Sequence, residues 1–100
     1  MNNLVVQKYG GTSVANTERF QAVADIVVES INDGVNVAVV VSAMAGETQR
    51  LIDLAKEIQA EPDPREFDAL VSSGEQVSAA LLAIALKERN LLSKSYTAHQ

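Results

Sequence analysis

Residues 35–41 read Val-Asn-Val-Ala-Val-Val-Val and are apolar except for Asn36. A continuous apolar run of this length, rich in β-branched residues, predicts a central strand that is covered on both faces. Residues 32–34, Asn-Asp-Gly, predict the end of a helix just before the run. Residues 42–46, Ser-Ala-Met-Ala-Gly, follow it directly. We therefore expect a buried strand framed by a helix on one side and a turn on the other.

The segment before this run has the same kind of pattern. Residues 4–6, Leu-Val-Val, predict a short buried strand that leads to the turn-forming pair Gly10-Gly11. Asn16 is a suitable N-cap residue, and Glu18 in the first turn suits the helix dipole. An apolar stripe at helical spacing follows. Its members are Phe20, Val23, Ala24, Val27 and Ile31.

The segment after the run predicts three helices. The first carries an apolar face made of Leu51, Leu54, Ala55 and Ile58. The next begins with Asp63 as N-cap, Pro64 in the first position and Glu66 closing a capping box. Residues 72–74, Ser-Ser-Gly, are poor helix formers, so we expect a break there and a new helix from about Glu75. That helix is apolar nearly all round, which predicts a sandwiched position, and residues 95–98 predict a third strand.

Alternation of strands and helices predicts an α/β fold with mainly parallel strands. In such sheets, ligands bind outside the carboxyl ends of the strands. Two unusual segments fall at such ends. Residues 8–13, Lys-Tyr-Gly-Gly-Thr-Ser, follow the first strand, and residues 42–46 follow the second.

Composition limits the classes of function. The chain has 100 residues, 47% of them apolar, and a net charge of −5, which fits one globular domain. The acidic balance argues against nucleic-acid binding. With no cysteine and one histidine, His99, a thiolate or histidine metal site is not expected. The longest apolar run, residues 79–86, is far shorter than the roughly 20 residues of a membrane span, and residues 1–4 lack the pattern of a secretory signal, so we expect none. We expect a cytoplasmic protein without membrane contact.

The first strand end offers groups suited to an anion. Gly10 and Gly11 allow backbone N–H groups to approach phosphate oxygens closely, and Lys8 places a cation beside them. The alternative is a plain turn with a solvated lysine. Neither the G-x-x-x-x-G-K-[ST] nor the G-x-G-x-x-G motif is present, so a phosphate would need another kind of loop.

Two further segments carry candidate groups for a small polar ligand. A helix begins near Gly46-Glu47-Thr48, and its free N–H groups would favour a carboxylate. The alternative is that Thr48 only caps the helix. Glu75 offers a carboxylate that can accept from an ammonium group, and its apolar neighbours suggest that it points into a crowded region. The alternative is a solvated glutamate at a helix end.

Three segments together resemble the N-terminal part of the aspartate kinases, within the amino acid kinase family. They are Lys8-Tyr9-Gly10-Gly11-Thr12-Ser13-Val14, residues 41–48 and Val71-Ser72-Ser73-Gly74-Glu75-Gln76, and the similarity covers the whole chain. Two positions depart from the family pattern. Tyr9 replaces a commoner phenylalanine, and Gln49 replaces the usual asparagine or aspartate.

The resemblance implies a three-layer α/β/α amino acid kinase fold and ATP-dependent phosphorylation of the β-carboxylate of L-aspartate with Mg²⁺. This is the first step toward lysine, threonine and methionine. By analogy Lys8 stabilises the transferring phosphoryl group, and it binds the ATP phosphates together with Tyr9, Gly10 and Gly11. Aspartate would contact Ser42, Thr48 and Glu75, the last through its α-ammonium group. No residue is expected to hold a metal directly.

The resemblance also implies that residues 1–100 are the N-terminal portion of a catalytic domain. The adenine-binding part and the regulatory domains would lie beyond them, so we expect no kinase activity from these residues alone. The apolar helix from about Glu75 and the unpaired sheet edge predict self-association of these residues, and we also expect a homo-oligomer. Two other interpretations stay open. One is a family member with another acceptor, such as acetylglutamate, glutamate or a nucleoside monophosphate. The other is a non-catalytic α/β assembly module.

Overall fold

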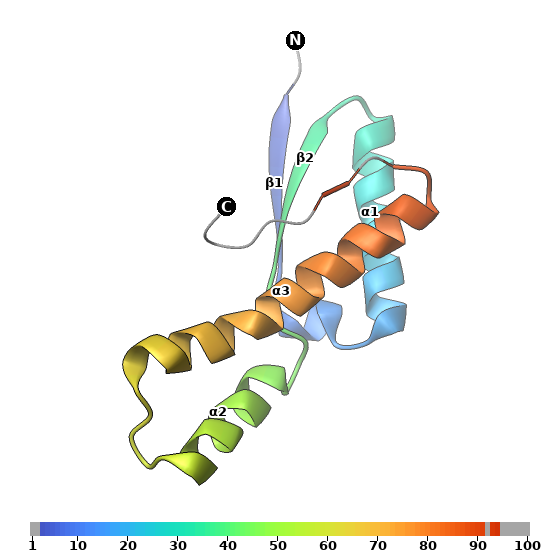
Figure 1. Ribbon diagram of the computed structural model, residues 1–100. Helices are drawn as coiled ribbons and strands as arrows, with labels where there is room; N and C mark the ends of the chain where they lie inside the picture. Colours follow the sequence, from blue (N-terminus) through green and yellow to red (C-terminus); the bar gives the residue numbers. More distant parts are fainter. Residues whose placement is uncertain (1–2, 92, 95–100) are drawn as a thin grey trace.

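A computed structural model describes residues 3–91 and 93–94. Its elements alternate between strands and helices, as Figure 1 shows. In chain order they are strand β1 (Leu4–Tyr9), the short 3₁₀ helix η1 (Gly11–Val14), helix α1 (Thr17–Asn32), strand β2 (Asn36–Val41), helix α2 (Glu47–Ile58) and helix α3 (Pro64–Glu88). The predicted third strand at residues 95–98, and His99, lie outside the described residues.

Strands β1 and β2 pair in parallel, which confirms the predicted α/β arrangement. The register runs from Leu4 opposite Asn36 to Tyr9 opposite Val41, so both strands end at the same edge. Ser42 extends the pairing by one hydrogen bond, because its N–H donates to the Tyr9 carbonyl at 3.0 Å. The segments that follow the two strands therefore start side by side.

Helices α1 and α3 cover one face of this sheet (Figure 1). The core lies between them and the strands, and α1 contributes its predicted stripe of Phe20, Val23, Ala24 and Val27, each at most 3% exposed. Asn16 caps α1 as predicted, since its side-chain oxygen accepts from the Arg19 N–H at 2.9 Å. The other sheet face is open among the described residues. Its exposed side chains are Leu4, Val6, Lys8, Asn36, Ala38 and Val40.

The prediction that both strands are buried was therefore wrong. Exposure alternates along β2, where Val40 is 52% exposed and Val41 only 9%. An all-apolar run is compatible with a strand that is covered on both faces. The described residues, however, provide helices for only one face of the sheet. The sheet and its helices thus make two of the three expected layers.

Helix α3 runs unbroken from Pro64 to Glu88, so the predicted break at residues 72–74 was wrong. The hydroxyl of Ser72 donates to the Ala69 carbonyl and that of Ser73 to the Leu70 carbonyl, which lets both serines remain helical. A contact with another part of the fold explains why position 74 is glycine. A Cβ built on it would lie 2.9 Å from the Cβ of Ala43, far inside contact distance.

The start of α3 agrees with its capping pattern in part. The Asp63 carboxylate accepts from the Glu66 N–H at 3.1 Å, and Pro64 is the first helical residue. In the predicted capping box, the Glu66 side chain would accept from the Asp63 N–H. In the structure this N–H donates to the Gln59 side-chain oxygen at 2.9 Å instead. The N-cap is thus confirmed, and Gln59 takes the second half of the capping box.

Helix α2 and the first half of α3 form an arm beyond the end of the sheet (Figure 1). The molecule accordingly measures 51 × 27 × 18 Å. Of the predicted α2 stripe only Leu51 is buried, whereas Ile58 is 90% exposed. The second half of α3 is also less enclosed than expected, because Val77 and Ile84 are 50% and 64% exposed. The exposure of Ile58 follows from the arm having neighbours on one side only, and Val77 and Ile84 lie outside the buried face of α3.

By length and apolar composition, α3 alone among the helices of the described chain passes the test for a membrane span. Core helices of soluble proteins pass the same test. Here α3 packs along α1, β2 and α2 and buries Gly74, Ser78, Leu82, Ala85 and Leu86 toward them. With 28% of its apolar window buried, we interpret it as a helix that packs on the sheet and on α1 and α2 along one face.

Candidate active site at the carboxyl ends of the strands

The three segments that carry the candidate residues meet at one edge of the sheet, and Ala43 lies between them. A Cβ built on Gly11 would lie 3.1 Å from the Ala43 carbonyl oxygen, so the first loop passes close against the second. A Cβ built on Gly74 would lie 2.9 Å from the Ala43 methyl carbon. Ala43 is only 7% exposed. The segments after β1 and β2 and the middle of α3 are therefore in direct contact.

The loop after β1 keeps its main chain accessible. Gly10 is extended, with φ −78° and ψ 175°, and a Cβ built on it would meet nothing within 4 Å. Its carbonyl accepts from the Ser13 N–H at 3.0 Å, which starts η1. Lys8 lies in β1 opposite Val40, with its side chain exposed on the open sheet face. The Lys8 cation and the backbone of Gly10 and Gly11 thus lie within a few residues of the strand end, and their phosphate-binding role stays a prediction.

Tyr9 lies differently from the other residues of this loop. Its hydroxyl donates to the Gln7 side-chain oxygen at 2.8 Å, and the Gln7 amide donates to the Ser30 hydroxyl at 2.9 Å. This chain of bonds lies on the helix-covered face, where burial raises the pKa of the Tyr9 phenol. The phenol is therefore turned toward α1, and any contact of Tyr9 with phosphate would have to come from its main chain.

The loop after β2 turns at Gly46, whose φ of +81° is a left-handed conformation that favours glycine. Gly46 is the N-cap residue of α2, and Thr48 is the second residue of the helix. The alternative role of Thr48 as a helix cap is therefore wrong. Ser42 directly follows β2, and both hydroxyl-bearing side chains are exposed. Their hydroxyl groups remain available to a ligand.

Glu75 follows Gly74 in the interior of α3, not at a helix start as predicted. It is exposed, which also differs from the crowded position that we expected. The buried face of α3 runs through Gly74, Ser78 and Leu82. The next residue in a helix is rotated by about 100° from its neighbour, so Glu75 stands beside the buried face and its carboxylate reaches solvent.

The polar side chains with candidate roles share one property. No hydrogen bond or ion pair within residues 3–91 and 93–94 engages them. They are the Lys8 ammonium, the Ser42 and Thr48 hydroxyls and the Glu75 carboxylate. Some exposed groups elsewhere are engaged, as in the pairing of Arg89 with Asp25 at 2.9 Å, whereas others in the described chain, such as Lys56 and Asp68, are also without a partner. Their location near the carboxyl ends of parallel strands, more than their lack of partners, is typical of a ligand site in an α/β protein.

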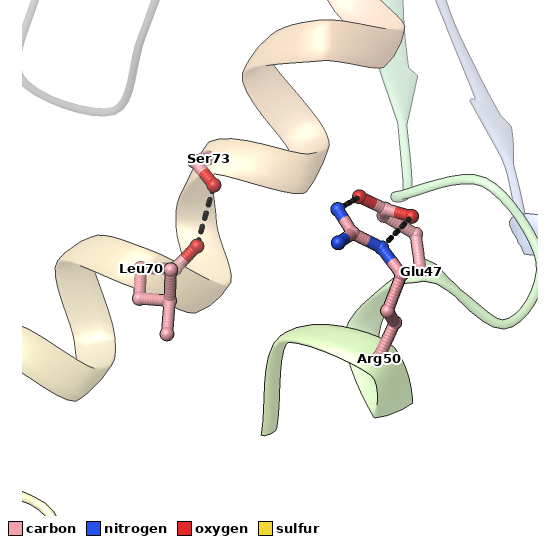
Figure 2. Close-up of polar contacts among 4 residues, drawn as sticks. All are labelled: Glu47, Arg50, Leu70 and Ser73. Carbon is pink, nitrogen blue, oxygen red and sulfur yellow. Dashed lines mark hydrogen bonds and ion pairs between the residues drawn. The ribbon is translucent and has the colours of Figure 1, made fainter. Parts of the chain in front are cut away.

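Glu47 and Arg50 form an ion pair at the first turn of α2 (Figure 2). The guanidinium donates twice to the carboxylate, from Nε at 3.0 Å and from Nη2 at 2.5 Å. These hydrogen bonds lower the pKa of Glu47. The Cγ atom of Glu47 would lie 3.6 Å from a Cβ at Gly74, so this ion pair stands against α3. Sequence reasoning missed both this ion pair and the central position of Ala43.

Arg50→Gln is expected to raise the pKa of Glu47 toward its ordinary value of 4.5. A lowered carboxyl pKa stabilises the fold above that value, and the contribution disappears as the pH falls through the lowered pKa. Titration of the Glu47 carboxyl by NMR measures this. Lys56→Gln removes another cation from the same helix and should leave the titration of Glu47 unchanged. Identical Glu47 titration in wild type and Arg50→Gln would contradict the pairing.

Residues 3–100 match the model of the amino acid kinase family, and the chain belongs to this family. The chain is also similar to individual aspartate kinases. It is 56% identical to the aspartate kinase Ask_LysC of Stutzerimonas stutzeri over 97% of this chain and 24% of that protein. The aspartate kinase structure from Synechocystis is similar with a TM-score of 0.89 and 49% identity, covering 91% of this chain and 16% of that one.

A third relative was solved with ligands. E. coli aspartokinase III, in complex with aspartate and ADP, is similar with a TM-score of 0.76 and 27% identity. The match covers 93% of this chain and 30% of that one. The chain thus spans about a quarter of the length of the curated relative that it matches.

Proposed function

We propose that this chain forms part of the catalytic domain of an aspartate kinase, which uses ATP to phosphorylate the β-carboxylate of L-aspartate. The observation that carries the proposal is the contact of three segments at Ala43, because these are the segments that contain or adjoin Lys8, Gly11 and Glu75. The similarity to an aspartokinase that binds aspartate and ADP supports it. Adenine binding and regulation would belong to parts of the relatives that this chain does not match.

The proposed reaction moves one phosphoryl group. A β-carboxylate oxygen of aspartate attacks the γ-phosphorus of ATP, the bond from that phosphorus to the bridging oxygen breaks, and ADP leaves. The products are 4-phospho-L-aspartate and ADP. Phosphoryl transfer depends mainly on positioning and on stabilising charge on the phosphoryl oxygens. Lys8 would supply a positive charge there, and the N–H groups of Gly10 and Gly11 would donate to the phosphates.

The other two segments would hold aspartate. Glu75 would accept from the α-ammonium group, since an exposed carboxylate with no partner among the described residues has free acceptor positions. Ser42 and Thr48 would donate hydroxyl hydrogen bonds to the carboxylates of aspartate. The N-terminus of α2 adds the positive end of a helix dipole to the same region.

Mg²⁺ would enter this site with ATP. The described residues contain no group of three or more histidine, aspartate or glutamate side chains able to hold a metal. Mg²⁺ commonly keeps several waters and binds through substrate phosphates. The ion would therefore be held mainly by the phosphates of ATP. The metal would neutralise phosphate charge. The protein groups named above would orient both substrates.

We further propose a cytoplasmic homo-oligomer that binds neither nucleic acid nor membranes. The net charge of −5 disfavours phosphate backbones. The uncovered sheet face and the apolar residues exposed on α3 provide surfaces that further protein would cover.

The proposal can be tested in a chimera in which this chain replaces the matching quarter of the Stutzerimonas stutzeri enzyme. Hydroxylamine traps acyl phosphates, and ADP release is measured in parallel with L-aspartate, L-glutamate, N-acetyl-L-glutamate or UMP as acceptor. We expect trapped product with aspartate, and kcat/KM roughly 10–100-fold lower with glutamate, because one methylene changes binding by about that factor. The parental enzyme is the control.

A folded chimera that releases no ADP with aspartate would contradict the proposal and favour a non-catalytic module. Preference for acetylglutamate or glutamate would keep the family and change the acceptor. ADP release with UMP and no trapped product would identify a nucleoside monophosphate kinase.

A further inference from the structure

We propose that Ala43 is a positioning residue of the site, whose methyl group and carbonyl set the spacing between the two strand-end loops and the middle of α3. The inference rests on the proposed function and deepens it. Ala43 touches neither substrate in this account. It would act through its neighbours Gly11 and Gly74, which border the candidate phosphate-binding and ammonium-binding residues.

Two close approaches carry the inference. At Gly11, a side-chain carbon would stand 3.1 Å from the Ala43 carbonyl oxygen and 3.6 Å from both the Cα and N atoms of Ala45. These are backbone atoms, which cannot rotate away as the end of a flexible side chain would. The loop that carries the free N–H groups is therefore seated directly on the loop that carries Ser42.

At Gly74 the approach is closer still. A Cβ there would stand 2.9 Å from the Ala43 methyl, and 3.6 Å from both Glu47 Cγ and Leu51 Cδ1. Ala43 and Leu51 are buried, so neither has free space to move into, whereas the partly exposed Glu47 side chain can shift together with Arg50. An added methyl group at position 74 would push α3 away from the loop. Glu75 would then move relative to Ser42 and Thr48.

The direction of the effect separates this inference from ordinary helix behaviour. Gly74 lies within a 25-residue helix, where replacement of glycine by alanine normally stabilises the protein. The contact with Ala43 predicts the opposite sign. Removal of the Ala43 methyl should restore space for the new one, so the two substitutions should compensate each other.

Four forms of the chimera test this: wild type, Gly74→Ala, Ala43→Gly and the double variant Ala43→Gly/Gly74→Ala. We expect Gly74→Ala to lower the melting temperature and raise the KM for aspartate roughly tenfold or more, because misplacement by about 1 Å is costly in a positioned site. The KM for ATP should change much less. The double variant should recover the wild-type melting temperature, and its KM for aspartate should return to within about threefold of wild type.

Ala80→Gly is the matched control, because it weakens α3 at an exposed position away from the contact. It should lower the melting temperature without changing the KM for aspartate. A Gly74→Ala form with wild-type KM and melting temperature would overturn the inference. So would a double variant no better than Gly74→Ala, including the case in which neither folds. The wild-type chimera could also be inactive while the double variant recovers the melting temperature lost in Gly74→Ala. That result would contradict the proposed function and would support the packing contact.

Discussion

Replacing Lys8 with alanine in the chimera is expected to lower kcat by about 10²–10³-fold, the usual loss when one group that stabilises transition-state charge is removed. The ammonium group of Lys8 has no carboxylate partner within the described residues, so its charge is not already neutralised. Only interactions that strengthen in the transition state raise kcat, and charge shifts on the phosphoryl oxygens as the bridging bond breaks. The KM for aspartate should therefore change much less than kcat.

Lys8→Arg keeps the positive charge and should retain more activity than Lys8→Ala. Lys56→Ala is the matched control, since Lys56 is an exposed lysine in the last turn of α2. It should leave kcat unchanged. Full activity in a folded Lys8→Ala chimera would remove Lys8 from the catalytic role.

Replacing Glu75 with glutamine is expected to raise the KM for aspartate roughly 10–100-fold, because a hydrogen bond to a charged group contributes about 1.5–3 kcal/mol. The substitution keeps the size of the side chain and removes its charge. The KM for ATP should stay within about twofold, since the proposed contact is with aspartate alone. Steady-state kinetics with each substrate varied in turn separates the two values.

Succinate lacks the α-ammonium group and provides a second measurement of the same contact. Its inhibition constant against aspartate should be nearly equal in wild type and Glu75→Gln, because Glu75 has nothing to accept from it. Asp68→Asn neutralises another exposed carboxylate of α3 and should change neither constant. If Glu75→Gln weakened aspartate and succinate equally, the effect would be structural and not a contact with the ammonium group.

Local features of the fold could be predicted from the sequence because they depend on neighbours in the chain. Asn16 and Asp63 cap their helices through hydrogen bonds to residues three positions later. Gly34 has a φ of +90° just past the end of α1, where the pattern predicted a stop. The parallel pairing of β1 and β2 follows from the helix that connects them.

Features that depend on distant contacts could not be predicted in this way. The sequence pattern predicts a helix break at Gly74, whereas the structure explains this glycine by its contact with Ala43, far away in the sequence. The apolar run in β2 indicates a strand but not which of its faces other elements cover. Tyr9 is next to Gly10 in the sequence, yet its phenol lies on the helix-covered face of the sheet, where it is bonded to Gln7 and, through Gln7, linked to Ser30.

The candidate site was predictable in its location and only partly in its geometry. The rule that ligands bind at carboxyl ends of parallel strands, together with the family resemblance, indicated the three segments. The exposure of Glu75 and its place inside a continuous helix required the structure. The contact that joins the segments is made by Ala43, a small apolar residue, and residue chemistry alone would not single it out.

The most direct test of the account is a crystal structure of the chimera with L-aspartate and ADP bound. We predict that the α-ammonium group of aspartate lies against the Glu75 carboxylate and that its carboxylates lie near Ser42 and Thr48. Lys8 should point toward the gap between aspartate and the β-phosphate. Aspartate bound elsewhere, with Lys8, Thr48 and Glu75 facing no shared ligand, would contradict it.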